Sequence, residues 1–167
     1  TGRGARLGIL VKSGAALQAA GGVDTVVFDK TGTLTVGAPR LTDLVPAAGQ
    51  DSAALLALAG AAEARSEHPL AKAVAAAARE KTPALPAPET FEAVPGRGVI
   101  ARIGGRDVLV GTAAFLAERD VAPDAAQEAA DAALAGAGKT PVRLAVDGVA
   151  AAVLAVADAP RPEAAAV

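Results

Sequence analysis

The sequence predicts an α+β fold, with an antiparallel sheet of about six strands flanked by two helical pairs and inserted into an incomplete α/β domain. Two turn signals carry most of this prediction, because Gly104-Gly105 and Asp147-Gly148 each separate two short stretches rich in β-branched residues, as in β-hairpins. The third observation is Val23–Asp29, a continuous apolar stretch that is typical of a buried parallel strand and does not fit the antiparallel sheet.

The elements of the α+β part are expected in a simple order along the chain. Asp51 and Ser66 are placed to cap two successive helices, and Pro123-Asp124 is placed to open a later one. The predicted strands are Arg40–Val45, Thr90–Val94, Val99–Ile103, Asp107–Gly111, Val142–Val146 and Val149–Val156. The predicted helices run from Asp51 to about Arg65, from Ser66 to about Lys81, and over Ala113–Arg119 and Asp124–Leu134.

Composition excludes several classes of function. The chain has 167 residues, no Cys and one His, which leaves no disulfide, no thiolate zinc site and no His-rich metal site. A net charge of −2 without a basic stripe argues against nucleic acid as a partner. No apolar run reaches the roughly 20 residues that a membrane-spanning helix needs. The missing initiator Met leads us to expect an excised piece of a longer protein.

The string that carries chemistry is Asp29-Lys-Thr-Gly-Thr-Leu-Thr35, at the carboxyl end of the predicted strand Val23–Asp29. Ligands of open α/β sheets bind at such strand ends, and a carboxylate there can attack a phosphoryl group and form a covalent intermediate. Attack between two anions needs neutralisation, normally by Mg²⁺ and a Lys, and Lys30 is adjacent to Asp29. The turn at Thr31 and Gly32 can reach phosphate oxygens. A solvated strand end followed by a polar turn is the alternative for Asp29.

The complete seven-residue string resembles the signature of the P-type ATPases, which belong with the haloacid-dehalogenase-like phosphotransferases. The resemblance implies that the incomplete domain is a haloacid-dehalogenase-like α/β domain. Related phosphatases usually carry a second Asp two residues after the nucleophile, where this chain has Thr31, and that difference favours a pump.

Other segments resemble the heavy-metal (type IB) branch of these pumps. Ser66-Glu-His-Pro-Leu70 resembles its His-Pro motif, with Glu63 five residues before His68. The remaining matches are Gly8-Ile-Leu-Val-Lys12, Gly96-Arg-Gly98, Gly111, Ala155-Val-Ala-Asp158 and Arg161-Pro162. The residues Thr1-Gly-Arg-Gly-Ala and Gly8-Ile-Leu-Val-Lys12 favour a copper-type over a zinc- or cadmium-type pump.

The resemblance implies ATP and Mg²⁺ as ligands. Asp29, Lys30 and Thr31 would be catalytic, and Asp29 and Thr31 would hold Mg²⁺ together with ligands outside this chain. His68 would pack against or hydrogen-bond the adenine, and Glu63 would accept from the adenine amino group. The other nucleotide-binding residues would be Gly96, Gly98, Val99, Gly111 and Thr112, the last standing where the family usually has Asn.

Each of these residues also has a structural interpretation. His68 could belong to a helix's first turn, Glu63 could be an exposed helix residue, and Gly96 and Gly98 could serve a turn after Pro95. Two further patterns are set aside. Gly96–Ala101 imitates a dinucleotide fingerprint but precedes a strand, and Gly136–Thr140 imitates a phosphate-binding loop without its first glycine. Lys139, in the second pattern, could line the ATP pocket or lie in solvent.

The predicted organisation has three parts. Residues 1–36 would begin a phosphorylation domain, residues 37–155 would form the nucleotide-binding domain, and residues 156–167 would be the return hinge. The intact pump would transfer the γ-phosphate of ATP to Asp29 and couple the aspartyl phosphate to metal export from the cytoplasmic side of a membrane. This piece alone would bind ATP or ADP without turnover, would not bind the transported ion, and would meet phosphorylation, actuator and transmembrane domains of the same polypeptide.

Three alternatives stay open at this stage. One is a haloacid-dehalogenase-like phosphatase. Another is a potassium- or calcium-type pump, against which the His-Pro motif argues. The third is a catalytically inert nucleotide-sensing module.

Overall fold

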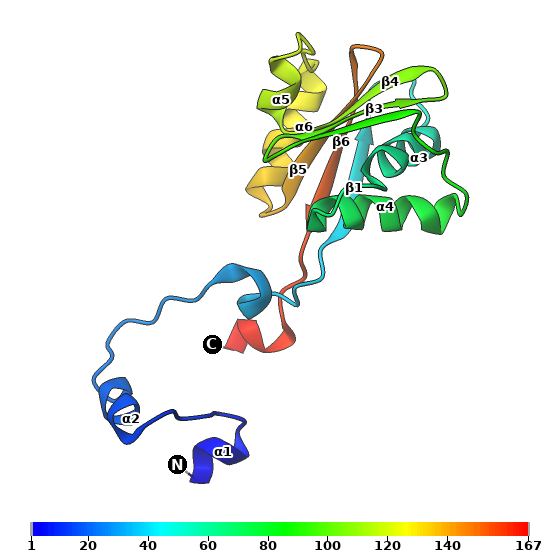
Figure 1. The fold of residues 1–167 in the computed structure, drawn as a ribbon. Helices are drawn as coiled ribbons and strands as arrows, with labels where there is room; N and C mark the ends of the chain where they lie inside the picture. Colours follow the sequence, from blue (N-terminus) through cyan, green and yellow to red (C-terminus); the bar gives the residue numbers. More distant parts are fainter. Residues whose placement is uncertain (1, 167) are drawn as a thin grey trace.

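The computed structural model in Figure 1 describes residues 2–166, apart from the side chains of residues 31, 165 and 166. Six strands form one antiparallel sheet in the order β1-β6-β5-β4-β3-β2. The strands are β1 (Arg40–Pro46), β2 (Thr90–Val94), β3 (Gly98–Ile103), β4 (Arg106–Gly111), β5 (Thr140–Val146) and β6 (Val149–Ala157). The predicted α+β class and its six strands are therefore confirmed, with ends that move by two residues or fewer.

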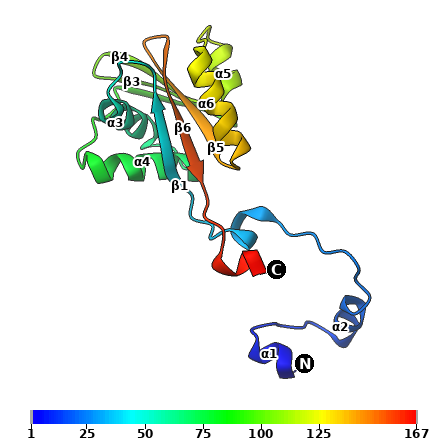
Figure 2. The same cartoon turned by 180° about the vertical axis from the view of Figure 1, so that it is seen from behind.

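Two pairs of helices cover the two faces of this sheet, as Figures 1 and 2 show from opposite sides. The first pair is α3 (Ser52–Glu63) and α4 (Pro69–Lys81), and the second is α5 (Ala113–Ala117) and α6 (Ala125–Gly136). Two separate hydrophobic clusters result. The larger cluster joins α3 and α4 to one sheet face, and the smaller one surrounds Phe115 and Leu116 of α5 on the other.

Both predicted hairpin turns are present. Gly104 and Gly105 have φ of +57° and +74°, and Asp147 and Gly148 have φ of +51° and +77°. Positive φ at both central residues is the requirement of a type I′ turn, whose twist matches that of the flanking strands.

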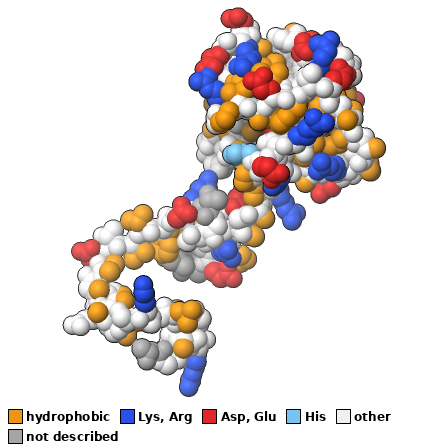
Figure 3. Space-filling model, viewed as in Figure 1, with side chains coloured by type: hydrophobic (Ala, Val, Ile, Leu, Met, Phe, Trp, Pro, Cys, Tyr) orange, Lys and Arg blue, Asp and Glu red, His pale blue; other side chains and the backbone are white. Residues whose placement is uncertain are grey.

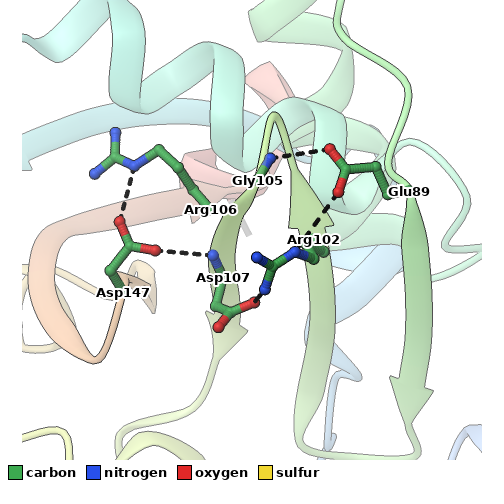
Figure 4. A network of polar contacts seen from close by, with 6 residues as sticks. All are labelled: Glu89, Arg102, Gly105, Arg106, Asp107 and Asp147. Atoms are coloured by element: carbon green, nitrogen blue, oxygen red, sulfur yellow. Dashed lines mark hydrogen bonds and ion pairs between the residues drawn. The ribbon is translucent and has the colours of Figure 1, made fainter.

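A network of polar contacts, drawn in Figure 4, joins these two turns. Its members bring together the β3–β4 hairpin, the β5–β6 turn and the segment before β2, and they are Glu89, Arg102, Gly105, Arg106, Asp107 and Asp147. Asp147 accepts from the Asp107 amide at 2.9 Å and from Arg106 Nε at 3.0 Å. The network therefore fixes the end of the sheet at which β3 finishes.

The helix pair α3–α4 packs closely because small residues face each other. A Cβ on Gly60 would lie 2.1 Å from Cβ of Ala78, so the two helices touch where Gly60 has no side chain. This close approach explains how an Ala-rich sequence with three Phe and no Trp or Tyr builds a core.

The start of α4 differs from the prediction. Asp51 caps α3 as expected, accepting from the Ala53 amide at 3.0 Å. The cap of α4, however, is His68 and not Ser66. Pro69 suits the first helical position, since its fixed φ fits the helix and it has no amide hydrogen to leave unpaired. Ser66 instead accepts from the His68 amide at 3.4 Å.

The predicted strand Val23–Asp29 is wrong as a strand in this structure. The segment forms no ladder with any other described residue, and Val26 and Val27 are 65% and 90% exposed. A strand exists only with partners that satisfy its backbone groups, and none lies beside it here. The other elements outside the sheet domain are α1 (Gly2–Arg6), α2 (Gly14–Ala20), the π-helical turn η1 (Lys30–Leu34) and the 3₁₀ helix η2 (Pro162–Ala166). None of the helices among the described residues is long and apolar enough to cross a lipid bilayer.

The two segments that lead into and out of the sheet domain run side by side. The amide of Val36 donates to the carbonyl of Ala159 at 2.9 Å, and that of Arg161 donates to Leu34 at 2.8 Å. The carboxylate of Asp158 accepts from the Thr35 hydroxyl at 2.5 Å and from the amide of Gly37 at 3.0 Å. These hydrogen bonds hold the pKa of Asp158 below its ordinary value, and the bond from the Thr35 hydroxyl has the largest effect. We call residues 34–38 with 158–161 the clasp.

Candidate functional site

A pocket of about 350 Å³ opens at the end of the sheet where β3 begins and β4 finishes, opposite the network of Figure 4. Its walls come from the end of α3, the α3–α4 connection, the β2–β3 turn, the start of α5 and the first residues of β5. All seven residues predicted to bind a nucleotide line this one pocket: Glu63, His68, Gly96, Gly98, Val99, Gly111 and Thr112. Their binding of a nucleotide stays a prediction.

Gly98 and Gly111, which are direct partners in the β3–β4 ladder, both line the pocket. A Cβ on Gly98 would lie 2.1 Å from the carbonyl oxygen of Val110. A Cβ on Gly111 would lie 2.4 Å from the carbonyl oxygen of Arg97 and 2.7 Å from the ring of Phe115. Both glycines were predicted to bind a nucleotide, and the structure shows that a side chain at Gly98 is already excluded by the close approach within the sheet itself.

Gly96 has a different reason to be glycine. It has φ of +71° in the turn between β2 and β3, and no atom lies within 4 Å of where its Cβ would be. Gly96 also lines the pocket. The positive φ thus explains why the turn has glycine at position 96, and the role of Gly96 in nucleotide binding stays a prediction.

His68 holds its ring at the pocket through the cap of α4. Its Nδ1 accepts from the Leu70 amide at 3.2 Å, so the neutral ring carries its proton on Nε2. The side chain is exposed, and Figure 3 shows the single histidine of the chain at the surface of the domain. One ring nitrogen thus caps the helix while the other can still donate, and the role of His68 in binding a nucleotide stays a prediction.

Glu63 is the buried carboxyl of the pocket. It ends α3 and is 7% exposed. Burial raises the pKa of Glu63 to about 7, so near neutral pH the group exists both as a carboxylate, which only accepts hydrogen bonds, and as a carboxylic acid, which can also donate one. The interpretation as an exposed helix residue is wrong. A buried carboxyl at the wall of an apolar cavity is typical of a ligand-recognising group.

Both the hydroxyl and the amide of Thr112 form hydrogen bonds within the chain. Its hydroxyl caps α5 by accepting from the Phe115 amide at 3.2 Å, and its amide donates to the Arg97 carbonyl at 2.9 Å. The backbone bond ties the start of α5 to the β2–β3 turn.

Sequence reasoning missed several lining residues. One of them is Arg97, which could have been found because it lies between two predicted nucleotide-binding glycines, Gly96 and Gly98. The others come from neighbouring elements and have no sequence signature: Ser66, Leu70, Ala93, Val94, Pro95, Thr140, Pro141 and Val142.

The predicted catalytic residues lie outside the pocket. Asp29 is exposed at the start of η1, and Nζ of Lys30 donates to the carbonyl of Gly138 at 3.5 Å. The side chain of Thr31 is not among the described residues. Lys139 does not line the pocket either, and it pairs with Asp43 at 2.5 Å, which lowers the pKa of Asp43.

The residues present do not make a complete Mg²⁺ site. Within the described residues, no three acidic, His or Cys side chains gather closely enough to hold a metal ion. Asp29 offers one carboxylate by itself, so its role as a metal ligand stays a prediction.

Comparison with known proteins gives concordant results. Residues 23–167 match the model of the haloacid dehalogenase-like hydrolases. The chain is 46% identical to copper-transporting ATPase 2 of Rhizobium meliloti over 95% of this chain and 19% of that protein. It is 43% identical to the copper-exporting P-type ATPase of Bacillus subtilis over 95% of this chain and 20% of that protein. The chain thus spans about a fifth of the length of these relatives.

Solved structures agree with the sequence matches. A zinc-transporting PIB-type ATPase in its E2.Pi state superposes with a TM-score of 0.76 at 39% identity, over 97% of this chain and 26% of that one. The N-domain of HMA6, a copper-transporting P-type ATPase, superposes with a TM-score of 0.61 at 26% identity, over 72% of this chain and 99% of that one.

Proposed function

The chain belongs to the haloacid dehalogenase-like hydrolase family and, within it, to the P-type heavy-metal ATPases, and on this premise we propose that its pocket binds ATP or ADP. One observation supports this most strongly. Seven residues singled out from sequence alone, spread from Glu63 to Thr112, line a single cavity of about 350 Å³. That volume lies in the range of small-molecule sites.

The chemistry of the walls suits an adenine ring. Ionised Glu63 accepts from the exocyclic amino group, and Nε2–H of His68 donates to a ring nitrogen or the ribose. Leu70, Val99 and Val142 offer an apolar surface to the flat base. The cap bond to Leu70 orients the His68 ring before the ligand arrives, which reduces the entropy lost on binding.

In the intact pump, a carboxylate oxygen of Asp29 attacks the γ-phosphorus of ATP. The bond from that phosphorus to the bridging oxygen of the β-phosphate breaks, and ADP leaves. Asp29 does not line the pocket, so the triphosphate must extend out of the pocket to reach it. Subsequent hydrolysis of the aspartyl phosphate would drive metal export, and this chain alone would bind nucleotide without turnover.

The division of the chain follows from the same proposal. Residues 1–36 and 156–167 would belong to the phosphorylation domain and residues 37–155 would form the nucleotide-binding domain, although the last strand of the sheet, β6, continues to Ala157. The partners are the remaining phosphorylation, actuator and transmembrane domains, with this part on the cytoplasmic side of the membrane. Copper is the proposed ion, because the similar sequences above are copper transporters, and the zinc-transporting structural relative makes zinc the alternative.

Calorimetry on the chain tests nucleotide binding. ATP, ADP and AMP are titrated into the wild type, His68→Ala and Glu63→Gln, with Glu92→Gln on the exposed side of β2 as a matched control. We expect both pocket variants to lose about tenfold in affinity and the control to keep it. Unchanged affinity in His68→Ala would contradict the pocket assignment.

A second experiment separates a pump from an inert sensor. The full-length parent is incubated with γ-labelled ATP, and the acid-stable, hydroxylamine-sensitive label on the protein is counted. We expect Asp29→Asn to abolish the label, and an undiminished label would contradict the proposed role of Asp29.

A further inference from the structure

The pocket has a single permanent cation to meet an anionic ligand. Among the described residues that line it, Arg97 is the one Arg or Lys, and Glu63 is the one Asp or Glu. The chain as a whole carries a net charge of −2. The negative charge of a phosphate chain at this pocket can therefore be neutralised either by Arg97 or by cations from solvent.

The backbone of Arg97 is held firmly at the pocket rim. Its amide donates to the carbonyl of Val94 at 3.0 Å, and its carbonyl accepts from the amide of Thr112 at 2.9 Å. The neighbours on both sides are Gly96 and Gly98, which keep the surrounding backbone free of side chains. The backbone of Arg97 is therefore fixed, whereas its guanidinium can change position by rotation of the side chain.

The present partner of Arg97 is Glu118, the residue that follows α5. The two side chains are 50% and 49% exposed, so water competes with the pair. Ion pairs that are exposed to this degree contribute little to stability, and exchanging one carboxylate for another anion is correspondingly easy. A phosphate chain carries more charge and accepts both arms of the guanidinium fork.

We infer that Arg97 recognises the phosphate chain of the nucleotide by leaving Glu118, so that the pocket distinguishes nucleotides from nucleosides through an exchange of anions on one guanidinium. The inference rests on the proposed function. It adds a specificity-determining residue at the phosphate end, and it makes Glu118 a competitor of the ligand.

Calorimetry with adenosine, ADP and ATP tests this exchange in the chain. In Arg97→Met we expect ATP and ADP to bind about tenfold more weakly, with adenosine unchanged. In Glu118→Gln we expect ATP to bind about two- to fivefold more tightly, again with adenosine unchanged. In the double variant the gain from Glu118→Gln should vanish, because it acts through Arg97.

Arg102→Met is the matched control. Arg102 pairs with Asp107 at 2.7 Å and is 48% exposed, so its loss changes the net charge equally but at the far end of the sheet. We expect it to leave all three ligands unaffected. An equal loss of ATP affinity in Arg102→Met would assign the effect to overall charge and overturn the inference.

The outcomes separate the inference from the proposed function. Binding of adenosine and ATP by the wild type, with neither affected by Arg97→Met, would overturn the role of Arg97 alone. Weaker ATP binding in Glu118→Gln would also overturn it, since Glu118 would then support the ligand. Failure of the wild type to bind either ligand would overturn both.

Discussion

Gly98 and Gly111 are paired across β3 and β4 so closely that a Cβ on Gly98 would lie 2.6 Å from Cα of Gly111. We expect Gly98→Ala and Gly111→Ala each to lower the free energy of unfolding by about 3 kcal/mol or more, because the neighbours are backbone atoms that cannot move aside. Urea denaturation checks this.

Gly136→Ala is the control for these substitutions. Gly136 ends α6, and its added Cβ would meet no atom within 4 Å. We expect its stability to equal or slightly exceed that of the wild type, since Ala favours a helix. Wild-type stability in Gly98→Ala would contradict the close pairing.

The raised pKa of Glu63, about 7 against an ordinary 4.5, makes stability depend on pH. The folded state holds this proton more tightly, so the contribution of Glu63 to stability is complete below its ordinary pKa and is lost as the pH rises through about 7. The whole effect amounts to about 3 kcal/mol.

We expect Glu63→Gln to remove this pH dependence, because the amide stays neutral. Unfolding is measured at pH 5 and pH 8.5 against wild type and Glu92→Gln. If the stabilities of Glu63→Gln and wild type change in parallel between these values, the buried carboxyl is not the cause.

The clasp is expected to open when Asp158 loses its charge. Its pKa is lowered by the Thr35 hydroxyl above all, so its contribution is present above the ordinary Asp value and disappears as the pH falls through the lowered one. In Asp158→Asn we expect faster hydrogen exchange at the amides of Gly37 and Ala38, which donate to this carboxylate.

Asp24→Asn provides a comparison for the clasp, since Asp24 accepts from the Thr25 hydroxyl at 3.0 Å within a local pair. We expect exchange at Gly37 and Ala38 to be unchanged in that variant. Unaltered exchange in Asp158→Asn would show that the backbone bonds alone maintain the clasp.

The contact between α3 and α4 can be tested by exchanging its two small residues. Gly60→Ala places a methyl group 2.1 Å from Cβ of Ala78, and we expect a loss of about 1–3 kcal/mol. Adding Ala78→Gly should restore much of it, because the clashing atom is removed. A double variant no more stable than Gly60→Ala would place the clash elsewhere, with Leu85 at 3.3 Å the next neighbour.

Local signals explain why the sheet domain could be predicted from sequence. The turns at Gly104-Gly105 and Asp147-Gly148 depend on the residues in them, and the caps at Asp51 and Asp124 bond to amides two or three residues away. Such short-range chemistry is visible in the order of residues. The α4 start was misplaced because Ser66 and His68 can both accept from a following amide, and Pro69 decides between them.

Features that depend on distant partners could not be predicted in this way. Val23–Asp29 has the composition of a strand, but a strand forms only beside another. The raised pKa of Glu63 follows from burial, and the pairing of Arg97 with Glu118 follows from how α5 lies against the β2–β3 turn. The pocket residues were identified through a family resemblance, and their convergence on one cavity depends on strand register.

The partners Arg40 and Ala157 lie opposite each other at the end of the β1–β6 ladder. A polypeptide that enters this sheet at β1 therefore leaves it about 5 Å away, one strand spacing from where it came in. A domain that carries this sheet as an insertion therefore needs only two attachment points as close together as the ends of a tight turn. The entropy lost in holding the two ends of the insertion together is offset by the folding of the sheet. The unit should accordingly tolerate transplantation into a surface turn of an unrelated protein, with both keeping their native cores.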